Sequence, residues 1–145
     1  MQLHEQANRL YRTALAYLGN PQEAEDAVQD TFLKYYEKAP KNLENPAAWL
    51  TRVLINRCRD RLRSPQWREV PLWEALPAPE PEEQEELEEL FSLPPEDRAV
   101  LHLFYYENYS TEEIAAMLRV RPGTVRSRLS RARERLRVLL KGEYD

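Results

Sequence analysis

Apolar residues recur three and four positions apart along most of this 145-residue chain, and this spacing limits what the chain can fold into. A helix with that spacing carries its apolar side chains on one face, which must be buried against a neighbour. In the first segment, residues 2–18, the repeating positions are Leu3, Ala7, Leu10, Ala14, Tyr17 and Leu18. The chain holds only three glycines, while Leu, Arg, Glu and Ala, which favour helices, are abundant. We therefore expect an all-α fold.

Capping residues divide the first half of the chain into three predicted helices. Gly19 suits the end of the first helix, and Asn20-Pro21 suits the start of the second, with Glu23 in the capping-box position. The second helix should span about residues 21–39 and the third about 46–63, so the three form a small bundle. The third helix is predicted to turn Trp49, Leu50, Val53, Leu54, the Arg57 stem and Leu62 inward, and Arg52, Asn56, Arg59, Arg61 and Arg63 outward.

Residues 69–89 break the helical pattern and predict an extended, acidic linker rich in Pro and Glu. Prolines at 71, 77, 79 and 81 exclude a continuous helix before about residue 82. From Glu80 to Asp97 there are nine acidic residues and no basic one. A helix is expected to resume near residue 81 and to reach Ser92. The predicted organisation is two small helical domains, residues 1–68 and 90–145, joined by the linker.

The second domain contains the pattern of a helix-turn-helix. An apolar helix is expected over residues 97–108. Ser110 and Glu113 then form a capping box at the start of a helix that ends at Leu118. A turn follows at residues 119–121, and the last helix should run from Pro122 to about Leu140. Arg119 occupies a turn position where glycine would be easiest, because a left-handed conformation strains other residues.

The last helix has an apolar face and an opposite polar, basic face. At 100° per residue, Val125, Leu129, Ala132 and Leu136 form the core stripe. Ser127, Ser130 and Arg131 lie on the opposite face, with Arg126 at its edge. The N-terminal half of a recognition helix is the part that meets base edges in the major groove. Thr124 and the first-turn N–H groups suit a phosphate. A solvated face is the alternative interpretation of any arginine-rich helix.

The net charge of −4 would argue against a nucleic-acid partner, but the charges are unevenly distributed. Residues 119–141 carry nine basic side chains and one acidic one, and residues 52–68 carry six arginines and one acid. These local fields matter more to DNA than the total charge. The basic helix at residues 52–63, with Trp49 at its start and the 41–45 connector before it, suits single-stranded DNA. Arg59 and Arg63 are plausible phosphate contacts, although spacing alone favours Trp49 as a core residue.

Three stretches together resemble the extracytoplasmic-function (ECF) group of bacterial sigma factors. LYRTALAYLGNPQEAEDAVQDTFLKYY resembles the part of the family's first domain that docks on the polymerase clamp. NPAAWLTRVLINRCRDRLR resembles the part that melts and reads the −10 promoter element. LPPEDRAVLHLFYYENYSTEEIAAMLRVRPGTVRSRLSRARERL resembles the domain that reads the −35 element.

The resemblance implies roles for particular residues. The residues that it implies for docking on the polymerase clamp are Asp26, Gln29, Asp30 and Phe32. The residues that it implies for contact with the −10 element are Asn42 and Asn45, in the loop that captures a flipped base, and Asn56, Arg57 and Arg61, in the helix behind that loop. The residues that it implies for contact with the −35 element are Thr124, Arg126, Ser127, Arg128, Ser130 and Arg131. The implied partners are core RNA polymerase, promoter DNA and an anti-sigma factor, and the linker would thread toward the polymerase active-site and RNA-exit region.

Other functions are less consistent with the sequence. A stand-alone helix-turn-helix regulator normally dimerises, and no dimer seam is evident, so we expect a monomer when free. A decoy that sequesters an anti-sigma factor without binding DNA stays open. No catalytic constellation, metal-ligand spacing or phosphate loop is present, so we expect neither an enzyme nor a cofactor. A single cysteine, Cys58, and the lack of a secretory signal or a long apolar run predict a cytoplasmic protein.

Overall fold

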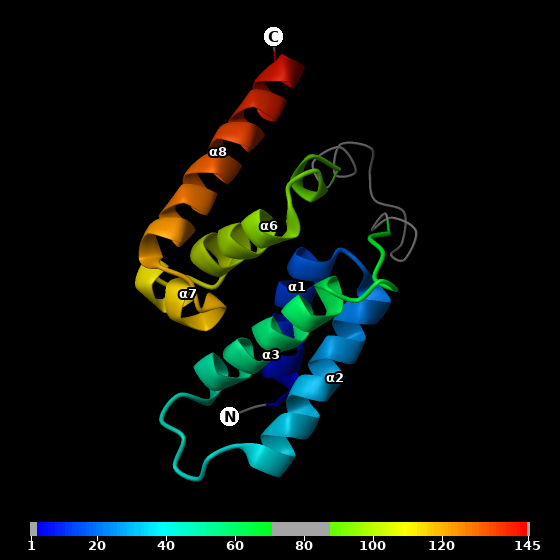
Figure 1. The fold of residues 1–145 in the computed structure, drawn as a ribbon, viewed down its shortest axis with the longest axis vertical. Coiled ribbons are helices and arrows are strands. Elements are labelled where there is room, and N and C mark those ends of the chain that lie inside the picture. Colours follow the sequence, from blue (N-terminus) through cyan, green and yellow to red (C-terminus); the bar gives the residue numbers. More distant parts are fainter. Residues whose placement is uncertain (1–2, 71–87, 145) are drawn as a thin grey trace. The chain divides into compact units, whose positions relative to one another are not determined.

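The computed structural model describes residues 3–70 and 88–144, with side chains as far as residue 137. The chain divides into two compact units, residues 1–69 and 70–145. Within the described ranges every regular element is helical (Figure 1). This confirms the all-α prediction. Most of the predicted linker, residues 71–87, and the expected helix start near residue 81 lie outside the described residues.

The first unit is a bundle of three helices, α1 (Leu3–Leu18), α2 (Pro21–Lys38) and α3 (Pro46–Leu62), and each packs against the other two. Its buried apolar side chains are Leu10, Ala14, Tyr17, Leu18, Ala24, Ala27, Val28, Leu50, Val53, Leu54, Ile55 and Cys58. The core of α3 differs from the prediction at its edges. Ile55 and Cys58 are fully buried, whereas Trp49 and Leu62 are only half-buried. The core face of α3 is therefore wider than one stripe, because both α1 and α2 contact it.

The predicted Gly19 and Asn20 caps form at the corner between α1 and α2, but the predicted capping box does not, because the Glu23 carboxylate pairs with Arg61 instead. Gly19 has a left-handed φ of 64°, and the Asn20 Oδ1 accepts hydrogen bonds from the N–H groups of Gln22 and Glu23. The Asn45 Oδ1 accepts from the Ala48 N–H at 3.1 Å. These caps satisfy N–H groups that have no partner inside their own helix, which fixes where α2 and α3 begin.

The segment after α3 folds back on the corner between α1 and α2. Trp67 Nε1 donates to the Leu18 carbonyl at 2.9 Å, and Asn20 Nδ2 donates to the Arg68 carbonyl at 2.8 Å. A Cβ atom on Gly19 would come within 2.9 Å of the Glu69 side chain. Glycine is therefore favoured at this corner both by its φ angle and by the close approach of Glu69.

The second unit contains α6 (Pro95–Leu101), a π-helical turn η1 (His102–Tyr106), α7 (Thr111–Leu118) and α8 (Pro122–Tyr144), preceded by a helical turn at residues 88–91. Its core is made of Leu93, Ala99, Val100, Leu101, Leu103, Ile114, Ala115, Met117, Leu118, Val125, Leu129 and Ala132. Both α6 and α7 pack against α8 (Figure 1).

The prediction of one regular helix over residues 97–108 is wrong in detail, because the helix has other bounds and is not α-helical throughout. It begins two residues earlier, at Pro95, and widens into a π-turn at His102. The Glu107 N–H donates to the His102 carbonyl, five residues back, which defines that turn. The wider turn places the His102 and Tyr106 rings in a stack with centroids 5.0 Å apart. This ring contact cannot be predicted from a helical periodicity of 3.6 residues per turn.

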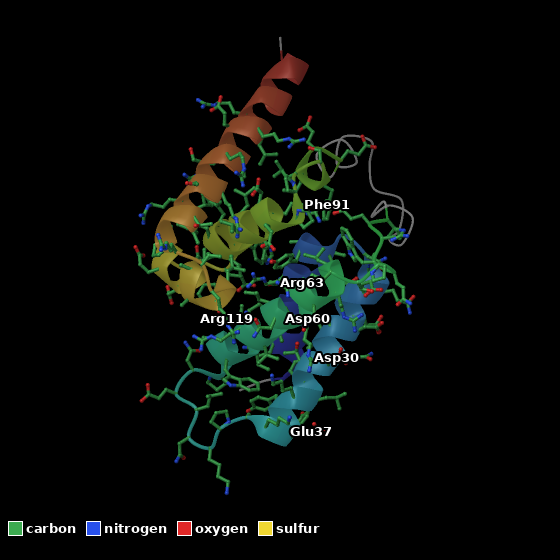
Figure 2. All side chains as sticks on the ribbon, in the orientation of Figure 1. Asp30, Glu37, Asp60, Arg63, Phe91 and Arg119 are labelled. Atoms are coloured by element: carbon green, nitrogen blue, oxygen red, sulfur yellow. The ribbon has the colours of Figure 1, made fainter. Side chains whose placement is uncertain are left out.

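Arg119, labelled in Figure 2, follows the last residue of α7. It adopts the strained left-handed conformation expected from the sequence, with φ 57° and ψ 44°. We expect Arg119→Gly to stabilise the second unit by about 1 kcal/mol, because glycine takes this conformation without a Cβ clash. Hydrogen-exchange protection of the α7 and α8 amides measures the effect. Arg121→Gly is the matched control, since residue 121 has no positive φ and glycine there should destabilise. Equal losses of protection in both variants would contradict the expectation.

Candidate nucleic-acid interface

The helix-turn-helix is fixed at both ends of its first helix. The Ser110 Oγ accepts from the Glu113 N–H at 3.1 Å, and the Glu113 carboxylate accepts from the Ser110 N–H at 2.9 Å. At the other end, the N–H groups of Arg119 and Val120 both donate to the Ala115 carbonyl. The predicted capping box is confirmed, and together these bonds hold α7 and the turn in one geometry relative to α8.

The predicted core stripe of α8 seats the helix on the second unit. Val125 and Ala132 are fully buried and Leu129 is 2% exposed, while Leu136 is half-buried. On the opposite face the exposed side chains include Arg126, Ser127, Ser130 and Arg131. The amphipathic assignment of this helix is confirmed, so its polar, basic face points to solvent.

Two shallow, adjoining hollows lie on this basic face. One, of about 500 Å³, is lined by Arg121, Gly123, Thr124, Ser127, Arg128 and Arg131. The other, of about 630 Å³, is lined by Gly123, Arg126, Ser127, Ser130, Arg131 and Glu134. All six residues predicted to bind the −35 element line one or both hollows. The structure therefore gathers them on a single surface of the N-terminal half of α8.

Thr124 differs from its prediction in one respect. Its N–H donates to the Arg121 carbonyl at 2.9 Å, so this amide is already used in the first turn of α8. Thr124 is half-buried, and a phosphate at this end of the helix would meet its hydroxyl group.

Acidic side chains of α6 and α7 lie close to several arginines of α8, but only one of these pairs is joined by hydrogen bonds. Arg131 donates through Nε and Nη2 to the buried carboxylate of Asp97. Arg128 Nη1 lies 3.6 Å from Glu96 Oε2. On α7 the pKa of Glu112 is lowered, first by its backbone hydrogen bond and the Thr111 hydroxyl and then by the charge of Arg126. Sequence reasoning did not predict these acidic partners, because their pairing depends on how α6 and α7 pack against α8.

The residues predicted for the −10 element occupy the connector and α3. Asn42 is exposed with a left-handed φ of 64°. Asn45 is exposed, and its side-chain oxygen Oδ1 caps α3. Asn56 and Arg57 are half-buried. Trp49 packs edge-on against Tyr35 with ring centroids 5.9 Å apart, so this half-buried tryptophan lies at the edge of the core and not inside it.

Arg61 does not lie on the outward side of α3 as predicted. Its guanidinium reaches α2 and pairs with Glu23 at 2.6 Å, Asp30 at 3.1 Å and Asp26 at 4.0 Å. Burial works to lower the pKa of Arg61, but the hydrogen bonds with Glu23 and Asp30 raise it above its ordinary value. A long side chain near the end of a helix can bend toward a neighbouring acidic helix. A helical wheel gives only the direction in which the side chain leaves its own helix, so it does not predict this contact. Arg61, which was predicted to contact the −10 element, therefore pairs with Asp26 and Asp30, which were predicted to dock on the polymerase.

The residues predicted to dock on polymerase lie along α2. Gln29 is exposed, whereas Asp26, Asp30 and Phe32 are half-buried. Two large apolar side chains beside them were missed: Leu33 is 58% exposed and Tyr36 is 67% exposed. Their spacing from Gln29, four and seven residues, was the signal, because it places all three on one face of the helix. Asp30 and Glu37 project from α2 in Figure 2 and line a hollow with Leu33, Lys34, Lys38 and Arg57.

Comparison with known proteins assigns a family to each of the two units. Residues 3–69 match the family Sigma-70 region 2, and residues 84–136 match Sigma-70, region 4. The two units therefore define a protein of the sigma-70 class.

The relatives narrow this class. The ECF RNA polymerase sigma factor SigE of Mycolicibacterium smegmatis is 35% identical over 93% of this chain, which spans 58% of SigE. SigM and SigL of Mycobacterium tuberculosis are each 35% identical and are covered over 71% and 85% of their lengths. The chain belongs to the ECF RNA polymerase sigma factor family.

Solved structures show the same fold. The sigma factor RpoE of Bartonella quintana, in complex with the anti-sigma factor NepR, has a TM-score of 0.69 and 28% identity, over 96% of this chain and 94% of that one. CnrH in complex with the cytosolic domain of CnrY has a TM-score of 0.67 and 25% identity, over 97% and 85% of the two chains. In the described part of this chain, no helix is both long and apolar enough to cross a bilayer.

Proposed function

We propose that this chain directs core RNA polymerase to specific promoters. In this proposal the first unit docks on the polymerase through α2 and contacts the −10 element through the 41–45 connector and α3. The second unit reads the −35 element through α8. The gathering of Thr124, Arg126, Ser127, Arg128, Ser130 and Arg131 on two adjoining hollows is the observation that supports it most strongly.

Each unit offers a small surface, so the two must act together. A weak contact at each promoter element becomes strong when the polymerase holds both units on one DNA molecule, since tethering raises the effective concentration of the second unit. The acidic linker, residues 69–89, would reduce DNA binding by the free protein by repelling the phosphate backbone. The free chain is then a cytoplasmic monomer that recognises promoters only in the holoenzyme.

An anti-sigma factor is a further proposed partner. One of the two similar solved structures is a complex of a sigma factor with an anti-sigma factor, and the other is CnrH in complex with the cytosolic domain of CnrY. The exposed apolar side chains Leu33 and Tyr36 on α2, and Tyr105 and Tyr106 in the second unit, offer surface for such a partner. Binding there would keep the chain from polymerase until a signal releases it.

Run-off transcription tests the proposal. Core polymerase with genomic template fragments should produce defined start sites only when this chain is added, and mapping those sites gives the promoter. Transcripts that are identical with and without the chain would contradict it. Specific DNA binding by a dimer of the free chain would instead favour the stand-alone regulator. Sequestration of an anti-sigma factor by a chain whose α8 has been inactivated, with no effect of α8 on transcription, would favour the decoy.

A further inference from the structure

A carboxylate in the first turn of α6 lies directly behind the basic face of α8. Asp97 is 1% exposed, and its two oxygens accept from Arg131 Nε at 3.1 Å and Arg131 Nη2 at 2.9 Å. The two residues are 34 positions apart in the sequence. This is the two-point geometry in which a carboxylate fixes both the position and the plane of a guanidinium group.

The two partners differ strongly in exposure. The Asp97 side chain is 2% exposed, whereas that of Arg131 is 62% exposed. A buried carboxylate needs a compensating charge, so Asp97 retains Arg131 strongly. The arginine, in contrast, presents most of its surface to solvent at the point where the two hollows of α8 meet. A pair that served only to join α6 to α8 would not need so exposed a cation.

The bond to Asp97 leaves part of the guanidinium available. An arginine has five N–H donors, and the pair uses Nε–H and one hydrogen of Nη2. The two hydrogens of Nη1 and the second of Nη2 remain on the edge away from Asp97. An unrestrained arginine loses much rotamer freedom when it binds a ligand, so a carboxylate that fixes it in advance reduces that cost.

We propose that Asp97 is a positioning residue for promoter recognition: it holds Arg131 with its free edge turned toward DNA. This deepens the proposed function and rests on it. Asp97 itself does not touch DNA. It carries a negative charge close to a DNA-binding surface, and its contribution comes from the order that it imposes on Arg131.

The direction in which one substitution changes DNA affinity distinguishes this positioning role from a purely electrostatic effect of the Asp97 charge. Asp97→Asn removes a negative charge near DNA, which by itself should tighten binding to the phosphate backbone. The positioning role predicts the opposite. We expect holoenzyme containing Asp97→Asn to bind its mapped promoter about threefold to thirtyfold more weakly, which corresponds to the freedom regained by one arginine side chain. Fluorescence anisotropy of labelled promoter DNA measures the affinity.

Two comparisons tie the effect to Arg131. In an Arg131→Ala background, Asp97→Asn should change affinity by less than about twofold, because the residue that it positions is gone. Glu96→Gln is the matched control: it makes the same change of charge one residue away, where the carboxylate lies 3.6 Å from Arg128 Nη1, beyond hydrogen-bond length. It should leave affinity unchanged or slightly tighter.

Folding is checked by hydrogen exchange of the α8 amides in each variant. Should Asp97→Asn unfold the second unit, Arg131→Lys decides the question, because lysine keeps the charge opposite Asp97 but cannot form the two-point bond. It should weaken promoter binding over the same range.

Unchanged or tighter binding by a folded Asp97→Asn variant, wild-type affinity of Arg131→Lys, or an equal loss in Glu96→Gln overturns the positioning role. In each of these cases wild-type holoenzyme still initiates at its mapped start site, so the proposed function stands. Failure of the wild-type chain to direct any specific start overturns both.

Discussion

Replacing Arg126 with alanine is expected to lower transcription from a cognate promoter about 5-fold to 150-fold while the chain stays folded. Arg126 is exposed on α8 and lines one hollow with Ser127 and Ser130. An arginine that pairs with a base through two hydrogen bonds discriminates by about 1–3 kcal/mol, which gives the expected range. Run-off transcription at low template concentration measures the loss.

Arg135→Ala is the control for the Arg126 experiment. It removes the same charge from the same helix, at an exposed position outside both hollows. If it affects DNA at all, it should weaken every sequence alike and lower the slope of binding against salt by at most about one. Similar losses in the two variants would mean that α8 contributes only its overall charge, and base recognition by this face would be rejected.

Replacing Arg98 with alanine is expected to destabilise the second unit by about 3 kcal/mol or more. Arg98 is 1% exposed, the largest of the fully buried side chains. Its Nη1 donates to the carbonyls of Leu93 at 3.1 Å and Phe91 at 3.3 Å, and its guanidinium lies 4.6 Å from the centroid of the Phe91 ring. Alanine would leave a cavity and remove donors from buried acceptors, and both effects are costly.

The Arg98 prediction is checked by hydrogen exchange in α6 and α8, with protection in α1 to α3 as the internal reference. A loss confined to the second unit is expected, because Arg98 packs within that unit. Arg98→Met, which fills the volume but cannot donate, should lie between wild type and alanine. Protection in Arg98→Ala that equals the wild type would show that the buried arginine contributes no net stability.

Local features of this fold could be predicted from the sequence because their causes are local. The left-handed Arg119, the Ser110 capping box and the burial of Val125, Leu129 and Ala132 each depend on residues within one or two helical turns. The exposed polar residues of α8, Arg126, Ser127, Ser130 and Arg131, follow from the same periodicity, since one helix carries them all. The resemblance to sigma factors then supplied roles that periodicity alone could not.

Features that depend on packing between helices were not predictable in this way. The pairing of Arg61 with Glu23 and of Arg131 with Asp97 joins residues 38 and 34 positions apart. Whether such a pair forms depends on the crossing of two helices, which the sequence pattern does not specify. The π-turn at His102 and the burial of Arg98 belong to the same group, because each is set by the surrounding side chains.

The dependence of promoter binding on polymerase is the central claim, and one titration tests it most directly. Labelled promoter DNA is mixed with the free chain, with core polymerase and with both, over a range of salt concentrations. Only the mixture of both should bind tightly and specifically, with an affinity that falls steeply as salt rises. Tight, sequence-specific binding by the free chain at physiological salt, or no gain when core polymerase is added, would contradict the account.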